Sequence, residues 1–157
     1  MEYQQEILEK LTLRTISYLK DDLGLSYENK SSFEIEEVKQ INYHKQVALI
    51  SLKGDIVGTI GMSISHEFAY DIAKAFVFGD CEDEELQELL HESSKEVLNV
   101  TIGNIISDLD IVRNGGKVDI SPPFDCDKSV LVKTNEKIMC ISKIKYNNQD
   151  IILSYIK

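Results

Sequence analysis

Residues 85–109 read ELQELLHESSKEVLNVTIGNIISDL, a stretch with no proline and a single glycine. Together with the residue before it, this stretch predicts one long helix over residues 84–109. At about 100° of rotation per residue, five side chains fall on one largely apolar face of that helix. They are Leu86, Leu90, Val97, Thr101 and Ile105. We therefore expect the helix to pack this face against the core of the protein.

The opposite face of the predicted helix is polar. It carries Glu88, Glu92, Glu96, Asn99 and Gly103, with Lys95 beside them. In a helix, asparagine costs several tenths of a kcal/mol and glycine about 1 kcal/mol relative to alanine, so helix formation does not explain their presence. Charged and amide residues are also ordinary on a solvated surface. A plain solvent face and a functional face are therefore both compatible with the pattern alone.

The bulk composition is that of one globular domain. A chain of 157 residues can bury a sizeable core but is small for two domains, so we expect a single domain over residues 1–157. The formal net charge is −10, and no basic stripe interrupts the acidic surface. Nucleic acids and anionic membranes both require clustered Lys and Arg, so neither is an expected partner.

No segment reads as a leader or a membrane span, because three glutamates occur within the first nine residues. The cysteines, Cys81, Cys126 and Cys140, are odd in number and widely spaced, which favours free thiols in a reducing cytoplasm. The three histidines form no ligand pair. We therefore expect a cytoplasmic protein that holds no metal or cofactor of its own.

The chain before the long helix predicts a helix, several strands and a second helix. The first helix is expected over residues 6–23, ended by Gly24, and is followed by a loop at 28–32 and strands at 33–41, 47–52 and 56–64. Gly58 and Gly61 in the last of these strands suggest a bulge or close approach of another backbone. Ser65 suits the N-cap of a helix that runs to about residue 78, where Gly79 ends it.

The chain after the long helix predicts strands. A turn at residues 114–116 precedes a short strand at 118–120, and Pro122 and Pro123 stop it. Further strands are expected at 130–134, 139–146 and 150–156, with Asn147 and Asn148 in the last turn. The prediction is an α+β fold with an antiparallel sheet of about six strands and helices packed on one side. The order of elements also suggests a weak internal duplication.

Two motifs together resemble a known family. Glu96 and Asn99 form a Glu-x-x-Asn pair followed by Val-Thr-Ile-Gly, and residues 118–123 read VDISPP. In order and spacing these segments resemble CheX, of the CheC/CheX/FliY family of chemotaxis phosphatases, over most of the chain. The resemblance implies a CheC-like fold with two pseudo-equivalent helices. The first helix lacks Glu-x-x-Asn, so one site per chain is implied.

The resemblance implies a hydrolase that removes the aspartyl phosphate of a CheY-type response regulator in signal transduction. Asn99 would orient the attacking water and Glu96 would pair with a lysine of the receiver domain, which would supply its own Mg²⁺. Glu92 and Gly103 are candidates for docking. The family usually has Asp or Ser where Glu92 stands, so docking could be altered or the receiver could be other than CheY.

Two other functions stay open. A CheX-like interaction or scaffold module without catalysis would share the fold, and a small-ligand domain is supported only by the glycines of residues 56–64. The strand at 150–156 has apolar residues on both faces, which predicts cover on both sides or an intermolecular contact. Since the resemblance implies dimers formed through their sheets, we expect a homodimer.

Overall fold

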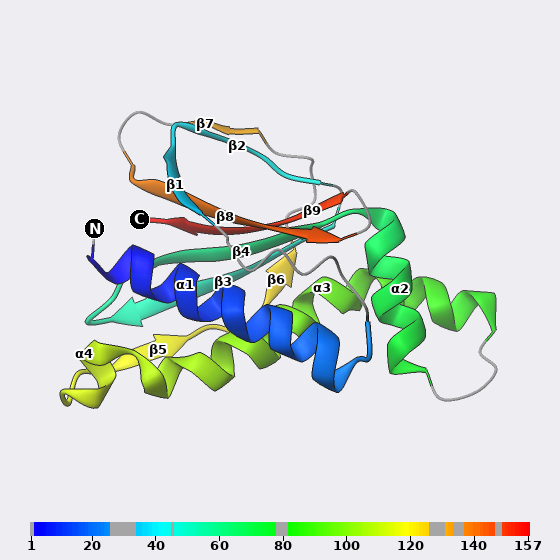
Figure 1. The fold of residues 1–157 in the computed structure, drawn as a ribbon, viewed down its shortest axis with the longest axis horizontal. Coiled ribbons are helices and arrows are strands. Elements are labelled where there is room, and N and C mark those ends of the chain that lie inside the picture. Colours follow the sequence, from blue (N-terminus) through cyan, green and yellow to red (C-terminus); the bar gives the residue numbers. More distant parts are fainter. Residues whose placement is uncertain are drawn as a thin grey trace.

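The structure is a computed structural model that describes residues 2–25, 34–44, 46–77, 82–125, 131–133, 137–146 and 149–157. Its helical segments are α1 (Glu2–Ser17), the π-helical turn η1 (Tyr18–Asp22), α2 (His66–Phe76), α3 (Asp83–Ile105), the 3-10 turn η2 (Ile106–Asp108) and α4 (Asp110–Arg113). Its strands are β1 (Ile35–Val38), β2 (Gln40–Asn42), β3 (Gln46–Gly54), β4 (Gly58–Ile64), β5 (Val118–Ile120), β6 (Phe124–Asp125), β7 (Leu131–Lys133), β8 (Met139–Tyr146) and β9 (Gln149–Ile156). Figure 1 shows their arrangement.

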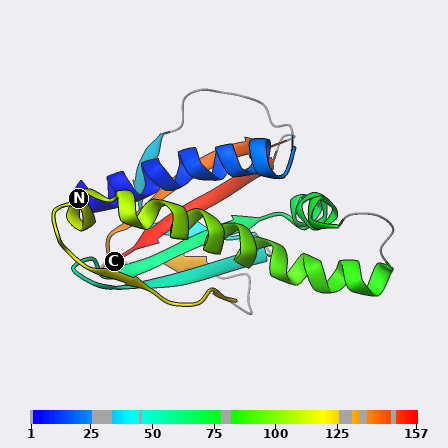
Figure 2. The same cartoon turned by 90° about the horizontal axis from the view of Figure 1, so that it is seen from below.

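The main sheet is antiparallel, as predicted. Within the described residues it has seven strands, six of them in the order β1-β8-β9-β4-β3-β5, and β6 also pairs with β3. Helices α1 and α3 lie side by side across one face of this sheet, α1 against β8 and β9 and α3 against β3 and β4 (Figure 2). The expected α+β architecture with helices on one side is thereby confirmed.

The strand order agrees with an internal duplication. One half consists of α1, β1, β3 and β4, and the other of α3, β5, β8 and β9. Each half contributes a hairpin, and the edge strand of each half pairs with the hairpin of the other, β1 with β8 and β5 with β3. The two hairpins meet at the centre of the sheet, where β4 pairs with β9.

The second face of the sheet carries a smaller apolar cluster beside the two-stranded sheet of β2 and β7. Ile41 of β2 packs there with Met139 and Ile152. Strand β9 is therefore covered on both faces within one chain, because Leu153 and Tyr155 are buried on the side of the helices. The apolar pattern of this strand does not by itself require a second copy of the chain.

Several expected bounds are wrong in detail. The first helix begins at Glu2 rather than residue 6, and its last turn, η1, is π-helical. The long helix ends at Ile105, because the chain continues as the 3-10 turn η2 and Leu109 adopts an extended backbone conformation with its side chain fully buried. The strand predicted at 33–41 divides into β1 and β2. The loop at 28–32, Gly79, Cys81, Cys126, Asn147 and Asn148 lie outside the described residues.

The predicted caps and glycines behave as their chemistry requires. The Ser65 hydroxyl accepts a hydrogen bond of 3.1 Å from the Phe68 N–H and so caps α2. Gly24 has φ of +66° after the first helix, a left-handed conformation that favours glycine. At Gly61 a Cβ would stand 2.6 Å from Ser154 Oγ, so the space beside this glycine is filled by side chains and not by the other backbone that was expected.

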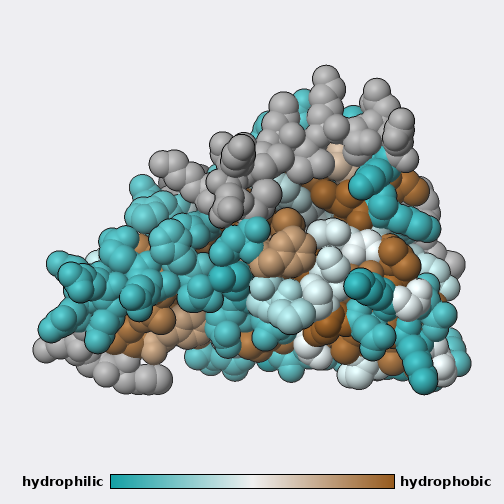
Figure 3. Space-filling view, turned by 180° about the vertical axis from the view of Figure 1, so that it is seen from behind, coloured by the Kyte–Doolittle hydropathy of each residue, from teal (hydrophilic) through white to brown (hydrophobic). Residues whose placement is uncertain are grey.

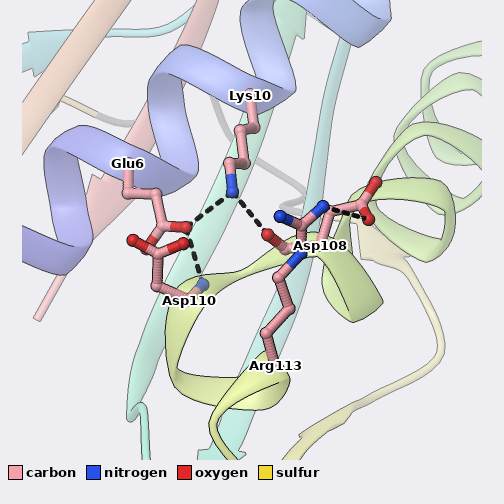
Figure 4. Close-up of polar contacts among 5 residues, drawn as sticks. All are labelled: Glu6, Lys10, Asp108, Asp110 and Arg113. Carbon is pink, nitrogen blue, oxygen red and sulfur yellow. Dashed lines mark hydrogen bonds and ion pairs between the residues drawn. The ribbon is translucent and has the colours of Figure 1, made fainter.

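Charged side chains fasten α1 to the segment after α3 (Figure 4). Lys10 Nζ donates to Glu6 Oε1 at 2.7 Å and to the backbone carbonyl of Asp108. Glu6 Oε1 also accepts from the Asp110 N–H at 2.8 Å, and Arg113 pairs with the Asp108 carboxylate at 3.1 Å. These contacts join α1 to the segment after α3, beside the buried apolar residues through which the two helices pack. No helix among the described residues combines the length and apolar character needed to cross a membrane.

Candidate functional site

The exposed side of α3 presents the residues singled out in the sequence. Glu92, Glu96, Asn99 and Gly103 are all exposed. Leu90, Val97, Thr101 and Ile105 are buried beneath them, as expected, and Leu86 is half-buried. The structure thus brings the four candidate residues onto one surface of one helix.

Glu96 and Asn99 are adjacent on this surface. Asn99 lies three positions after Glu96, and side chains three positions apart are neighbours on the surface of a helix. Neither side chain makes a hydrogen bond or ion pair with another described residue. A carboxylate and a carboxamide held on a rigid helix, both free to meet a partner, are the central feature of the site.

Gly103 continues the same surface without a side chain. A Cβ built on Gly103 would meet no atom within 4 Å, so the core does not demand glycine there. Its φ is not in the left-handed region either. The feature that glycine provides is bare, exposed backbone on which another molecule could come close.

The turn η1 forms one flank of the site. Tyr18 is buried, and this burial is the main reason why the pKa of its phenol is raised. The negative charges of Glu96 and Asp22 raise the pKa further, and the positive charge of Arg14 lowers it slightly. Arg14 pairs with the Asp22 carboxylate at 3.3 Å. The phenol of Tyr18 therefore stays neutral beside Glu96 at physiological pH.

Lys95 and β6 form the other flank. Lys95 Nζ lies 2.9 Å from Glu92 Oε1, one turn earlier on α3, and 3.2 Å from Asp125 Oδ2 on β6. The pKa of the Lys95 ammonium group is raised, and the largest cause is its hydrogen bond to Glu92. Burial lowers this pKa, and the contact with Asp125 raises it further. Lys95 is therefore charged at neutral pH, and the extra carboxylate of Glu92 is paired within the chain.

The surface over the N-terminal part of α3 is hydrophilic. Figure 3 shows hydrophilic side chains gathered over the N-terminal part of α3, at the left of that view. The exposed acidic residues of this part are Glu82, Asp83, Glu84, Glu85 and Glu88. Acidic side chains in the first turn also complement the positive end of the helix dipole, so their presence has a structural reason.

The chemistry open to this site is that of positioning. An amide can accept from and donate to one water molecule, and a carboxylate can pair with a cation. Among the described residues, no group of three His, Cys, Asp or Glu side chains is placed to hold a metal ion. The arrangement is suited to completing an active site that another protein brings to it.

Sequence reasoning missed both flanks. Strand β6 follows Pro122 and Pro123 directly, and two residues carry no periodicity that could reveal a strand. The contact between Lys95 and Asp125 joins residues far apart in the chain, so only the folded sheet brings them together. The nearness of Tyr18 to Glu96 depends in the same way on how α1 lies against α3.

Comparisons with known proteins agree with this architecture. The sequence model of the family described as Chemotaxis phosphatase CheX matches residues 46–144. The crystal structure of a chemotaxis protein CheX from Desulfovibrio desulfuricans is similar with a TM-score of 0.74 and 14% identity, over 97% of this chain and 99% of that chain. No curated protein matches the sequence significantly.

Two further structures show the same fold. A chain of the CheX–CheY–BeF3–Mg²⁺ complex from Borrelia burgdorferi has a TM-score of 0.66 and 24% identity, over 96% of each chain. A CheC-like superfamily protein from Shewanella sp. PV-4 has a TM-score of 0.66 and 14% identity, also over 96% of each chain. At these identities the likeness concerns the fold and leaves the chemistry of the site to be argued from its residues.

Proposed function

Because this chain belongs to the CheX family of chemotaxis phosphatases, we propose that it hydrolyses the aspartyl phosphate of a CheY-type response regulator. The observation that carries the proposal is the pair Glu96 and Asn99, exposed together on α3 and unengaged within the described chain. A structural relative that forms a complex with CheY, BeF3 and Mg²⁺ supports the choice of partner.

Asn99 orients the water that attacks phosphorus. Its carboxamide oxygen accepts a hydrogen bond from the water and its NH₂ group can donate one, without any change of protonation state. The water oxygen bonds to phosphorus, the bond from phosphorus to the receiver's aspartate breaks, and the products are inorganic phosphate and the free carboxylate. Most of the catalysis of phosphoryl transfer is positioning and charge stabilisation, which an oriented amide can supply.

Glu96 fixes how the receiver docks. Its carboxylate pairs with the lysine of the receiver's active site, a charge-assisted hydrogen bond with defined geometry. The receiver would supply the phosphoryl group and its own Mg²⁺, which would provide charge neutralisation at the phosphoryl oxygens. Gly103 lets the receiver approach the backbone of α3, and Glu92 lies at the edge of the same surface.

The test is the decay of a phosphorylated receiver domain, followed with and without the protein. We expect the protein to accelerate decay, and Glu96→Gln to lower kcat/KM by about ten- to a hundredfold, since a hydrogen bond to a charged group contributes about 1.5–3 kcal/mol. Glu84→Gln is the matched control, because it removes the same charge from the first turn of α3. Equal losses in both variants would contradict a specific role for Glu96.

A non-catalytic interaction module is the second candidate, because an exposed Glu96 and Asn99 can also bind a receiver without hydrolysing its phosphate. Binding of the receiver without any faster decay would support it and contradict the phosphatase. We further propose that the protein is a homodimer of the cytoplasm, where response regulators act. Light scattering at micromolar concentration tests the dimer, and a monomer mass would refute it.

A further inference from the structure

We propose that Lys95 sets the register of docking by withholding Glu92 from the receiver, so that Glu96 is the carboxylate that meets the receiver's cation. This inference rests on the proposed function and adds a specificity-determining residue to it. It is carried by the way charges are paired around the exposed middle of α3.

Four carboxylates around the exposed middle of α3 carry this inference, and three of them are paired with cations. Glu92 and Asp125 both pair with Lys95, at 2.9 and 3.2 Å, and Asp22 pairs with Arg14 at 3.3 Å. Glu96, the fourth, has no ion pair or hydrogen bond to a described residue. The carboxylate nearest Asn99 along the helix is thus the one offered to a partner.

Glu92 would otherwise compete with Glu96. The two carboxylates are four residues apart on the same helix face, which places them about 6 Å apart along the helix axis. A receiver whose lysine paired with Glu92 would sit one turn too far toward the start of α3, and Asn99 would no longer reach the phosphoryl group. Glu88 lies a further turn away, about 12 Å from Glu96 along the axis, so pairing there needs a larger displacement.

Lys95 is well placed to prevent this competition. Its side chain is only 17% exposed, whereas that of Glu92 is 62% exposed. Two carboxylates from different elements hold the ammonium group, one on α3 and one on β6. Because Glu92 and Asp125 both hold the ammonium group of Lys95, this group stays beside Glu92 when a receiver binds. It does not move away to pair with a carboxylate of the receiver.

Binding in the wrong register has a distinctive effect on the kinetics. A receiver bound one turn out of place occupies the protein, but its aspartyl phosphate is not hydrolysed. Such non-productive binding lowers kcat and KM by the same factor, so kcat/KM stays nearly constant. If the correct and the wrong register are equally stable, kcat and KM are both halved. If the freed Glu92 is preferred by about 1 kcal/mol, a value typical of exposed ion pairs, both constants fall about sixfold.

The experiment compares Lys95 variants of the whole chain on a CheY-type receiver phosphorylated with acetyl phosphate. We expect Lys95→Gln to lower kcat and KM together by about two- to sixfold, as derived above from the ion-pair energy. Lys95→Arg keeps both constants, because arginine can pair with the same two carboxylates. Adding Glu92→Gln to Lys95→Gln raises kcat and KM again, since the competing charge is gone.

Asp125→Asn separates this role from a structural one. It removes the negative charge that β6 offers to Lys95 and leaves the ion pair with Glu92, so both constants should change less than in Lys95→Gln. A rise in KM for Lys95→Gln, or no recovery on adding Glu92→Gln, overturns the inference while the wild-type activity stands. Absence of stimulated decay by the wild-type protein overturns the proposed function, and the inference with it.

Discussion

Replacing Asn99 with alanine should abolish most of the phosphatase activity and leave the fold slightly more stable. The side chain is exposed and makes no hydrogen bond to a described residue, so its removal costs no contact within that part of the chain. Alanine is the best helix former, so the free energy of unfolding should rise by about 0.5 kcal/mol. For a chain of this length that corresponds to a Tm higher by about 1–2 °C.

The expected loss of activity is far larger than the change in stability. Removing one preorganised hydrogen-bonding group that acts in the transition state costs about 10²–10³ in kcat, or about 2.7–4 kcal/mol. Stopped-flow decay of the phosphorylated receiver measures this loss. Affinity for the receiver with BeF3 bound should change less than about threefold, because the oriented water matters mainly in the transition state.

Asn104→Ala is the matched control. Asn104 is exposed on the same helix, but it lies five residues on, about 140° around the helix axis from Asn99. The same substitution there should raise Tm by a similar amount and leave kcat unchanged. The reasoning is refuted if Asn99→Ala retains kcat within about threefold of wild type, or if Asn104→Ala loses as much as Asn99→Ala.

Three further outcomes are expected. Gly103→Ala should raise the free energy of unfolding by about 1 kcal/mol, because the new Cβ has open space around it. The same substitution should weaken binding of the receiver in calorimetry, and tighter binding would contradict a close approach of the receiver to the backbone of α3. Ser65→Ala should lower the free energy of unfolding in urea by about 1 kcal/mol through loss of the α2 cap, and an unchanged midpoint would refute that cap. Lys95→Met should be less stable than wild type below the ordinary lysine pKa of 10.5, and the difference should vanish as pH rises through the higher pKa of the folded state. A difference that persists in urea melts above that pH would show that packing, not charge, is responsible.

The sequence predicted the elements whose pattern is local. Strands β5 and β8 have the bounds expected for them, and α2 begins after Ser65, because alternation, prolines and caps act within a few residues. The exposed and buried faces of α3 also followed from helical periodicity, and so Glu96 and Asn99 were placed on the surface correctly. Their proposed chemical roles rest on the family and await the kinetic tests.

What the sequence could not predict depends on contacts between distant segments. Helix α3 ends at Ile105, and the extended Leu109 that follows is buried in the core, which local propensity does not report. The pairing of Lys95 with Asp125 requires β6 to lie against β3, and that register is a property of the folded sheet. Glu92 therefore looked like an extra charge offered to a partner, whereas in the folded chain Lys95 neutralises it.

The exchange of edge strands between the two halves has a consequence for how the chain folds. The hairpins β3–β4 and β8–β9 can each form from neighbouring residues. Strand β1 can pair only after β8 has been made, because Ile35 pairs with Ser142. The centre of the sheet waits longer still, because Thr59 pairs with Ile156 near the end of the chain. During synthesis on the ribosome, one edge of β4 therefore stays unpaired until β9 emerges. High contact order of this kind favours slow folding, although α3 can already pack against β3 and β4 before β9 is added.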